Sequence, residues 1–253
     1  MPPNLRSRSS VYKLQAFFQR CKMNEFDFAS ADLKSQDFTF ANPSSFLLAG
    51  QTRSGKTTFT LNVLRNIETL FANPECRHNV VYFYKDDQPA FEIFKEENIV
   101  KHWVNRLPTG EDIEKLTKGF EESGSIVVID DFDLDVNADT ADIFRNKCHH
   151  RNCVIIMLTQ NIFCNQPYFT EISNQVTYVI IFKNPRNAAQ ITCFAKQVAP
   201  GAVPGFVAEY RKATRRPHSY LLFDTHQKTK EPYRLRSRIL PHEMPMVVHV
   251  RQQ

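Results

Sequence analysis

Residues 43–58 combine a short apolar run, two glycines, a lysine and threonines in an order that suits the binding of a polyphosphate. Gly50 and Gly55 flank four residues, and Lys56 and Thr57 follow directly. The glycines allow the backbone to wrap a phosphate at a helix N-terminus, where the dipole favours anions. Lys56 would reach the β- and γ-phosphates of a nucleoside triphosphate, and Thr57 would bind Mg²⁺. The expected nucleotide-binding residues are Gly50, Gln51, Thr52, Arg53, Ser54, Gly55, Lys56, Thr57 and Thr58.

Two acids end the apolar segment that begins at Ser125. Residues 126–129 are continuously apolar, which predicts a buried strand, and ligands bind at the carboxyl ends of strands in open α/β sheets. Asp130 would hold the Mg²⁺ shell, while Asp131 would polarise the attacking water. An apolar strand followed by an acid is common by itself. The two acids therefore indicate a nucleotide site only in combination with the phosphate loop.

Gln160 follows the apolar residues 154–158, so its amide could orient water or sense the γ-phosphate. The structural alternative is a polar strand end that is capped by its neighbours. A cation is often needed to stabilise the transferring phosphate, and Arg145, Arg151 and Arg186 lie near predicted loops and helix ends. We rank Arg186 first as a catalytic residue, although each arginine taken alone also fits a surface or DNA-facing position.

The segments around these residues alternate between strand and helix patterns. Phe46–Ala49 leads into the loop, and apolar residues then recur at helical spacing from Phe59 to Phe71. Further strands are expected at 79–84, 126–129, 154–158, 176–182 and 220–223, and we expect no strand after the last of these. Helices are expected at 90–97, 111–122, 139–148 and 187–197. This alternation predicts an α/β fold with a mainly parallel sheet that is covered on both faces.

Positive charge gathers at both ends of the chain. Residues 1–22 contain five Lys or Arg and no acid, and residues 211–238 contain nine Lys or Arg against two acids. We expect a basic N-terminal arm at 1–37, with a short helix at 11–18 and a lead into an edge strand, an ATPase domain at 38–227 and a basic C-terminal tail at 228–253. Such stretches can contact phosphate backbones, but solvated surfaces explain them equally well.

The composition fits one substantial α/β domain, since 42% of the 253 residues are hydrophobic. No run approaches the roughly 18 apolar residues that span a bilayer, and no apolar stretch follows the basic N-terminus as in a signal peptide. We therefore expect a soluble, unsecreted, intracellular protein with no membrane partner. Six scattered cysteines indicate a reducing compartment rather than a disulfide framework.

Cys148, His149, His150 and Cys153 are residue types that can bind zinc. Their spacing does not fit a zinc site, because Cys153 would enter a buried strand and point away from its partners, and no second ligand pair follows. Free cysteine is also a frequent core residue. We therefore expect no metal at this cluster.

Several blocks of the sequence resemble the FtsK/HerA-type genome-packaging ATPases of double-stranded DNA viruses, including poxvirus-like ones, and of Polinton/Maverick and adintovirus-like elements. The blocks are Pro43 with 46–50, Tyr82 with Tyr84, Gln88-Pro89, Leu107-Pro108, 129–131, 149–152, 159–161, 182–186 and Gln190. They cover about residues 38–240. The phosphate loop alone is generic, whereas the block from 149 to 161 and the Lys-Asn-Pro-Arg block at 183–186 are fairly specific to this group.

The resemblance implies a RecA/ASCE-like, three-layer α/β/α P-loop NTPase domain that assembles into a ring, usually a hexamer or pentamer, around double-stranded DNA. ATP hydrolysis with Mg²⁺ would drive the DNA into a capsid, so capsid proteins are further expected partners. By the same analogy Gln160 is the sensor, and an arginine of a neighbouring subunit completes the site. The resemblance also implies a location in the host nucleus, a viral assembly site or the virion.

Two positions depart from the pattern of this group. Many relatives place Glu after the first acid, where this chain has the shorter Asp131. Some relatives carry an arginine just before an Ile-Ser pair, whereas Thr170 and Glu171 precede that pair here. The role of Asp131 as the base and the identity of the arginine finger therefore stay open.

Other functions fit the sequence less well. A regulatory GTPase would carry Asn-Lys-x-Asp after a late strand, and residues 183–186 do not match. A nucleotide kinase shares the loop, but it would show an arginine-rich lid and lack an added strand between the strands of the loop and of the acid, which we expect at Asn79–Tyr84. A non-motor NTPase and a low-turnover DNA-binding ring subunit stay open, although the intact loop and acids argue against the latter.

Overall fold

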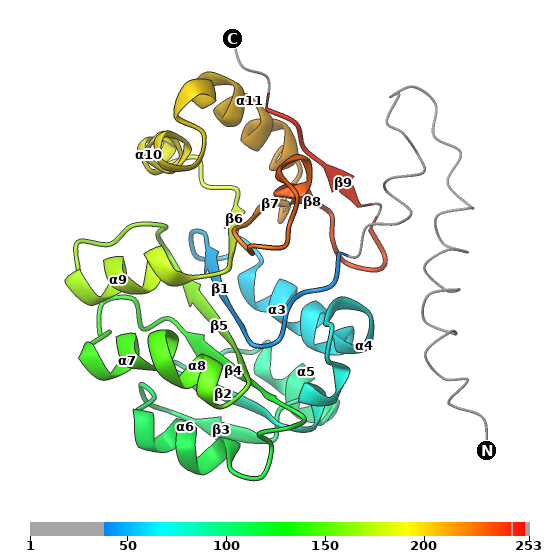
Figure 1. Cartoon of the computed structure of the whole chain (residues 1–253), viewed down its shortest axis with the longest axis vertical. Helices are drawn as coiled ribbons and strands as arrows, with labels where there is room; N and C mark the ends of the chain where they lie inside the picture. Colours follow the sequence, from blue (N-terminus) through cyan, green and yellow to red (C-terminus); the bar gives the residue numbers. More distant parts are fainter. Residues whose placement is uncertain (1–37, 244, 251–253) are drawn as a thin grey trace. The chain divides into compact units, whose positions relative to one another are not determined.

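A nine-stranded sheet, in the order β3-β2-β4-β5-β1-β6-β7-β8-β9, runs through the part of the chain that the structure describes (Figure 1). The computed structural model describes residues 38–243 and 245–250. The expected N-terminal arm at 1–37, with its short helix and most of its edge strand, lies outside these residues. Phe40 forms a single parallel bridge with Phe71.

Six neighbouring strands are parallel, and their residues are almost all apolar. They are β1 (Ser44–Ala49), β2 (Val80–Tyr84), β3 (His102–Val104), β4 (Ser125–Asp130), β5 (Cys153–Thr159) and β6 (Tyr178–Phe182). The β-branched residues of β4 and β5 suit a strand that is buried on both faces. Parallel strands need crossover connections, and helices provide most of them here.

Helices cover both faces of the sheet (Figure 1). One face packs against α3 (Lys56–Arg65), α4 (Ile67–Leu70) and α5 (Phe91–Glu96). The other packs against α6 (Gly110–Thr117), α7 (Ala138–Asp142), α8 (Cys148–His150), α9 (Pro167–Gln175), α10 (Ala188–Val198) and α11 (Val203–Ala213). Successive side chains of β4 alternate between the two cores, with Val127 in one and Val128 in the other. The predicted three-layer α/β/α fold is confirmed.

The sheet continues past β6 with antiparallel strands, which the sequence analysis did not predict beyond Tyr220–Phe223. These strands are β7 (Tyr220–Asp224), β8 (Leu235–Ser237) and β9 (Met246–Val247). The expectation that the sheet ends at 223 was therefore wrong. β8 and β9 are too short for a periodic pattern, and Arg236 in β8 looks like a surface residue although it is 6% exposed.

The strand between β1 and β4 in the sheet is β5, not the strand at 79–84. Our expectation for Asn79–Tyr84 was wrong, because β2 pairs with the far side of β4. Order along the chain does not determine which parallel strands become neighbours, since each crossover can pass over other strands. A strand does lie between β1 and β4, as expected, but it is β5.

Several helical segments differ from the sequence expectations. The helix expected at 139–148 is divided into α7, a π-helical turn η2 (Ile143–Lys147) and α8. The helix expected to reach Glu122 ends at Thr117. β3, α9 and α11 were not predicted, nor were the short 3₁₀ segments η1 (Pro74–His78), η3 (Pro200–Ala202) and η4 (Glu231–Tyr233). Of the helices described, none has the length and apolar character needed to cross a bilayer.

Arg236→Ala should lower the free energy of unfolding by about 3 kcal/mol or more, because it leaves the Asp224 carboxylate of β7 buried without its ion-pair partner. Lys212→Ala, which removes the exposed ion pair with Glu209, is the matched control and should cost less than about 1 kcal/mol. Urea unfolding measures both. Equal losses would contradict the view that β8 is an integral part of the folded sheet.

Candidate functional site

The sequence-predicted polar residues meet at the carboxyl edge of the parallel strands. Ala49 of β1 is in register with Thr159 of β5, and Leu158 of β5 is in register with Asp130 of β4. The residues that follow these strand ends therefore lie next to one another. This register brings together the phosphate loop, the acids after β4 and Gln160, which are far apart in the sequence.

Backbone hydrogen bonds and two glycines define the shape of the loop between β1 and α3. Gly50 N donates to Thr159 O at 3.1 Å, and Ser54 N donates to Gln51 O at 3.0 Å, which closes a turn. A side chain on Gly50 would come within 2.6 Å of Ser54 Oγ. Gly55 has a φ of 103° and is the N-cap of α3, so within the described residues no side chain caps this helix. The first N–H groups of α3 are therefore suited to an anion.

Lys56 folds back across the loop. Its Nζ donates to Gly50 O at 2.5 Å and to Gln51 O at 3.4 Å. Burial lowers the pKa of Lys56, while the nearby Asp130, Asp131 and Asp133 act in the opposite direction. The ammonium is thus held above the loop, in the field of three acids.

Asp130 is 3% exposed and lies at the centre of a hydrogen-bonded network. Tyr82 OH donates to Asp130 Oδ2 at 2.8 Å, and Gln88 Nε2 donates to the same oxygen at 3.2 Å. Gln88 Oε1 in turn accepts from Thr57 Oγ1 at 3.2 Å. Burial raises the pKa of Asp130 to about 6, against the opposing effects of Tyr82, Lys56 and Gln88. The network therefore links the two residues predicted to bind Mg²⁺.

Thr57 and Asp130 offer hydroxyl and carboxylate oxygens, which are the types of ligand atom that Mg²⁺ prefers. A cation beside Asp130 would also favour its ionised form and offset the effect of burial. The donor set is therefore consistent with Mg²⁺ bound together with phosphate oxygens.

The predicted base and the predicted sensor lie side by side. Gln160 Nε2 donates to Asp131 Oδ1 at 3.2 Å, and Asp131 N donates to Leu158 O at 3.2 Å. Asp131 has a φ of 65°, in the left-handed region that non-glycine residues seldom adopt. Such backbone conformations cluster at functional sites, where the surrounding structure holds them. Gln160 is exposed and Asp131 half-buried, so both side chains can reach a bound ligand.

Asp133 is a third acid of this site that the sequence analysis missed. It is 6% exposed, and its Oδ2 accepts from Thr159 Oγ1 at 2.9 Å and from Gln160 N at 3.3 Å. Asp133 thereby ties the segment after β4 to the segment after β5. A sequence signal existed in its spacing of two residues from Asp131, which places both acids beside the same strand end.

The three candidate arginines differ in their surroundings. Arg145 pairs with Glu171 at 3.0 Å, and Arg151 pairs with Glu121 at 3.2 Å. Arg186 is exposed in the connection between β6 and α10, and its backbone N donates to Asn184 Oδ1 at 3.2 Å. Within the described residues Arg186 has no ion pair and no side-chain hydrogen bond to the phosphate loop. The structure thus does not bring Arg186 to the loop of its own chain.

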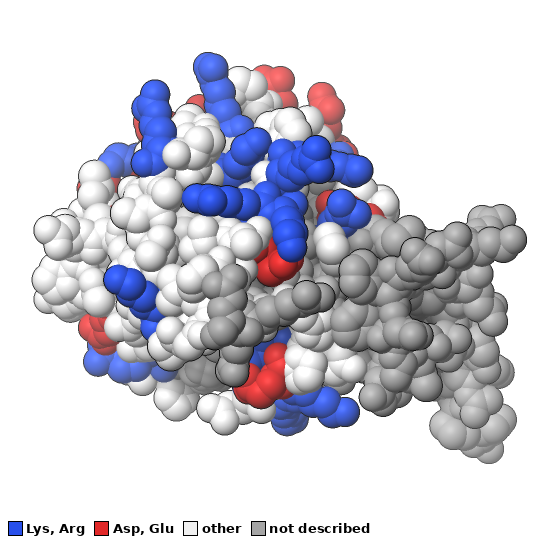
Figure 2. Space-filling view, turned by 90° about the horizontal axis from the view of Figure 1, so that it is seen from above, with Lys and Arg blue, Asp and Glu red and all other residues white. Residues whose placement is uncertain are grey.

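The basic stretch at 211–238 is not one continuous surface, because Arg236 is buried against Asp224. Figure 2 shows Lys and Arg side chains gathered on the face viewed from above, the end of the molecule at which Figure 1 draws α10 and α11. The exposed basic residues of these helices and the connections beside them are Lys183, Arg186, Lys196, Arg211, Lys212, Arg215 and Arg216.

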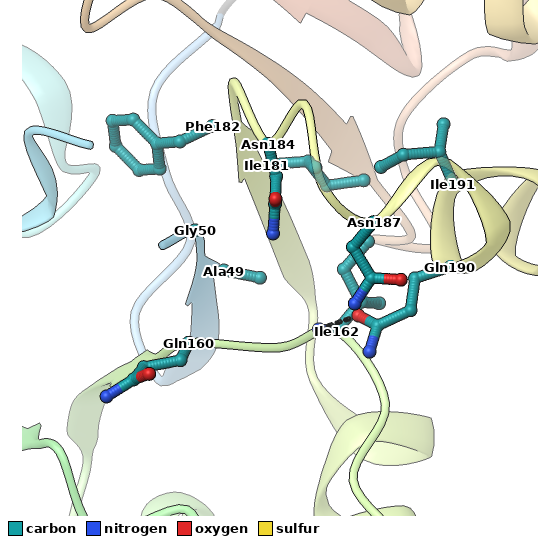
Figure 3. Close-up of a pocket in the computed structure, with 10 residues that line it drawn as sticks. All are labelled: Ala49, Gly50, Gln160, Ile162, Ile181, Phe182, Asn184, Asn187, Gln190 and Ile191. Atoms are coloured by element: carbon teal, nitrogen blue, oxygen red, sulfur yellow. Dashed lines mark hydrogen bonds between the residues drawn. The ribbon is translucent and has the colours of Figure 1, made fainter. Parts of the chain in front are cut away.

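A small pocket lies beside the loop, between the ends of β1 and β6 and the start of α10 (Figure 3). Gln190 fixes the segment behind Gln160, since its Oε1 accepts from Ile162 N at 2.9 Å and its Nε2 donates to Asn161 Oδ1 at 3.2 Å. Figure 3 shows the Gln160 side chain pointing away from Asn187 and Gln190. Gln160 therefore lines one side of the pocket while its amide is directed towards Asp131.

His218 is a further residue at the loop that the sequence analysis did not identify. Its Nδ1 lies 3.3 Å from Ser54 O, so Nδ1–H can donate to this carbonyl. A Cβ on Gly55 would lie 3.1 Å from the ring. No local pattern marks this residue, because it comes from the segment between α11 and β7.

A glycine loop between β1 and α3, with an acid at the end of β4 in a mainly parallel sheet, gives the strand, loop and helix arrangement of a P-loop fold. The predicted α/β fold class with a mainly parallel sheet is confirmed.

Comparisons with known proteins give a limited likeness. No family model matches the chain, and no curated protein matches it. The structure of the genome packaging NTPase B204 from Sulfolobus turreted icosahedral virus 2 in complex with AMP is 17% identical over 74% of this chain and 96% of that chain, with a TM-score of 0.48. The same NTPase in complex with ATP-gammaS is 14% identical over 74% and 95%, with a TM-score of 0.47. Likenesses of this strength do not bear on what this chain binds.

Asp133→Ala should lower the free energy of unfolding by about 1 to 3 kcal/mol, because the N–H of Gln160 and the hydroxyl of Thr159 lose a buried acceptor. Asp133→Asn keeps one oxygen acceptor and should lose less. Asp135→Ala, which removes an exposed ion pair with Lys85, is the control and should lose less than about 1 kcal/mol. Denaturant unfolding ranks the three variants, and a loss for Asp133→Ala no larger than the control would refute the anchoring role.

Proposed function

We propose that the chain is an ATPase that binds ATP with Mg²⁺ at residues Gly50–Thr58 and hydrolyses it to ADP and phosphate. The observation that carries this proposal is the meeting of three groups at one sheet edge. Lys56 lies across the loop, Thr57 is linked to Asp130 through Gln88, and Asp131 contacts Gln160. These are the groups needed to bind a triphosphate, neutralise its charge and orient water.

Each group has a distinct part in the proposed reaction. Backbone N–H groups of the loop bind the phosphates, and the Lys56 ammonium turns from the loop carbonyls to the β- and γ-phosphate oxygens. Thr57 and Asp130 would hold Mg²⁺, which when bound neutralises charge that develops on the phosphates. Asp131 accepts a proton from the attacking water, and the Gln160 amide orients that water. The contact between Asp131 and Gln160 places the two side chains on one side of the site.

We further propose that hydrolysis drives double-stranded DNA through a homo-oligomeric ring, a hexamer or pentamer, into a capsid. The sequence blocks shared with packaging ATPases support this assignment, as do the exposed basic residues around α10 and α11. An exposed Arg186 without an ion pair among the described residues suits a residue that completes the site of the next subunit. Capsid proteins are the further partners, and an assembly site or the virion is the proposed location.

A nucleotide kinase is the alternative enzyme. The position of β5 between β1 and β4 argues against it, because nucleotide kinases lack a strand at this place. A low-turnover DNA-binding ring subunit is the non-enzymatic alternative. Turnover measurements separate it from the motor.

Steady-state ATP hydrolysis by the full chain, with and without long duplex DNA, tests the proposal. We expect hydrolysis that duplex DNA stimulates and that Lys56→Ala reduces by about 100-fold or more, since the ammonium stabilises charge in the transition state. Hydrolysis that depends on Lys56 but is not changed by DNA would support the ATPase assignment and contradict the proposal that the protein is a DNA motor. Absence of turnover at high protein concentration would favour the non-enzymatic subunit.

The proposed contact between DNA and the exposed basic residues around α10 and α11 can be tested separately. Replacing Arg215 and Arg216 with Gln should weaken duplex binding and reduce the slope of log affinity against log salt by about two, since each lost phosphate contact contributes about 0.9. Replacing the exposed Lys115 and Lys118, in and after α6 at the end of the fold away from α10 and α11 (Figure 1), with Gln is the matched control. Fluorescence anisotropy over a salt series measures both. Identical slopes for the two double variants would mean that residues 215–216 do not contact DNA.

A further inference from the structure

Gln88 is hydrogen-bonded to both residues that are proposed to bind Mg²⁺. We infer that Gln88 is a positioning residue, which holds Thr57 and Asp130 in the orientation in which both can meet Mg²⁺. The inference rests on the proposed function, because it concerns the same ATP and Mg²⁺ site. It adds a residue that neither the loop motif nor the acid motif contains.

The side-chain amide of Gln88 bridges the two residues. Thr57 Oγ1 donates to Gln88 Oε1 at 3.2 Å, and Gln88 Nε2 donates to Asp130 Oδ2 at 3.2 Å. No direct hydrogen bond joins Thr57 to Asp130 within the described residues. A primary amide is suited to this place because it offers an acceptor and a donor in one plane. Glutamate would lack the donor, and it would place a second negative charge beside Asp130.

The direction of these hydrogen bonds determines which lone pairs stay available. The hydroxyl of Thr57 has one hydrogen, and its donation to Gln88 leaves the lone pairs of Oγ1 for a cation. Tyr82 and Gln88 both donate to Oδ2 of Asp130, so Oδ1 receives no hydrogen bond from the part of the chain described. Each residue therefore keeps an oxygen for Mg²⁺ or for a water in its shell. Partners of this kind orient metal ligands and are needed for full metal affinity.

The backbone around Gln88 is held firmly enough for this role. Gln88 lies between β2 and α5, and its carbonyl accepts from Phe91 N at 2.9 Å. Pro89 restricts the backbone directly after it. Phe91 is fully buried, and its ring centroid lies 5.1 Å from that of Tyr82. The same β2–α5 unit thus supplies both donors to Asp130, and aromatic packing fixes their relative position.

Nucleotide affinity measured with and without the metal tests the inference. The probe is N-methylanthraniloyl-ATP, titrated against the full chain in MgCl₂ and then in EDTA. Gln88→Met removes both hydrogen bonds with little change in side-chain volume. We expect its affinity in MgCl₂ to fall about tenfold, in line with the loss of groups that orient metal ligands, and its affinity in EDTA to match the wild type. Asp86→Asn, an exposed position in the same connection, is the control and should match the wild type in both buffers.

The possible outcomes are distinct. Loss of affinity in both buffers would overturn the inference, because it would indicate damage to the loop rather than to the metal site. Unchanged or tighter binding in MgCl₂ would also overturn it, the latter because Gln88 would then obstruct the metal. Gln88→Ala repeats the test if Gln88→Met does not fold. Failure of the wild type to bind the probe in either buffer would refute the proposed function itself.

Discussion

The buried carboxylate of Asp130 is the constraint around which the site is arranged. An ionised acid that is 3% exposed is costly unless donors or cations surround it. Tyr82, Gln88 and Lys56 each favour its charged form, yet burial still raises its pKa to about 6. These three groups therefore offset only part of the effect of burial on the pKa of Asp130. A cation beside Asp130, as in the proposed function, would favour the ionised form further.

The parallel sheet makes this arrangement possible because it collects strand ends at one edge. β1, β5 and β4 are neighbours in register, so the phosphate loop, Gln160 and the acids after β4 meet. Asp133 and the left-handed backbone at Asp131 then set the geometry within that edge. The two apolar cores pack against both faces of these strands, and packed interiors deform little. The relative positions of the site residues therefore depend on the packing of helices against both faces of the sheet.

The antiparallel strands after β6 add a second support to the phosphate loop. β7 carries Asp224, which pairs with Arg236 of β8, and this buried pair joins the two strands. The connection that enters β7 places His218 against Ser54 and Gly55. The same connection presents Arg215 and Arg216 to solvent. Loop support and exposed positive charge therefore come from one short segment.

The sequence by itself determined the features that depend on local order. The loop from Gly50 to Thr58, the apolar strands and the acid at the end of β4 are read from adjacent residues and from periodicity, and the α/β class follows from their alternation. Tertiary structure alone decided which strand lies beside β1, because parallel pairing depends on crossovers rather than on order along the chain. It also decided the contacts of Gln88, Asp133 and His218, because their partners are distant in sequence. Arg236 escaped prediction for a related reason, since a charged residue is assigned to the core only when its partner is seen.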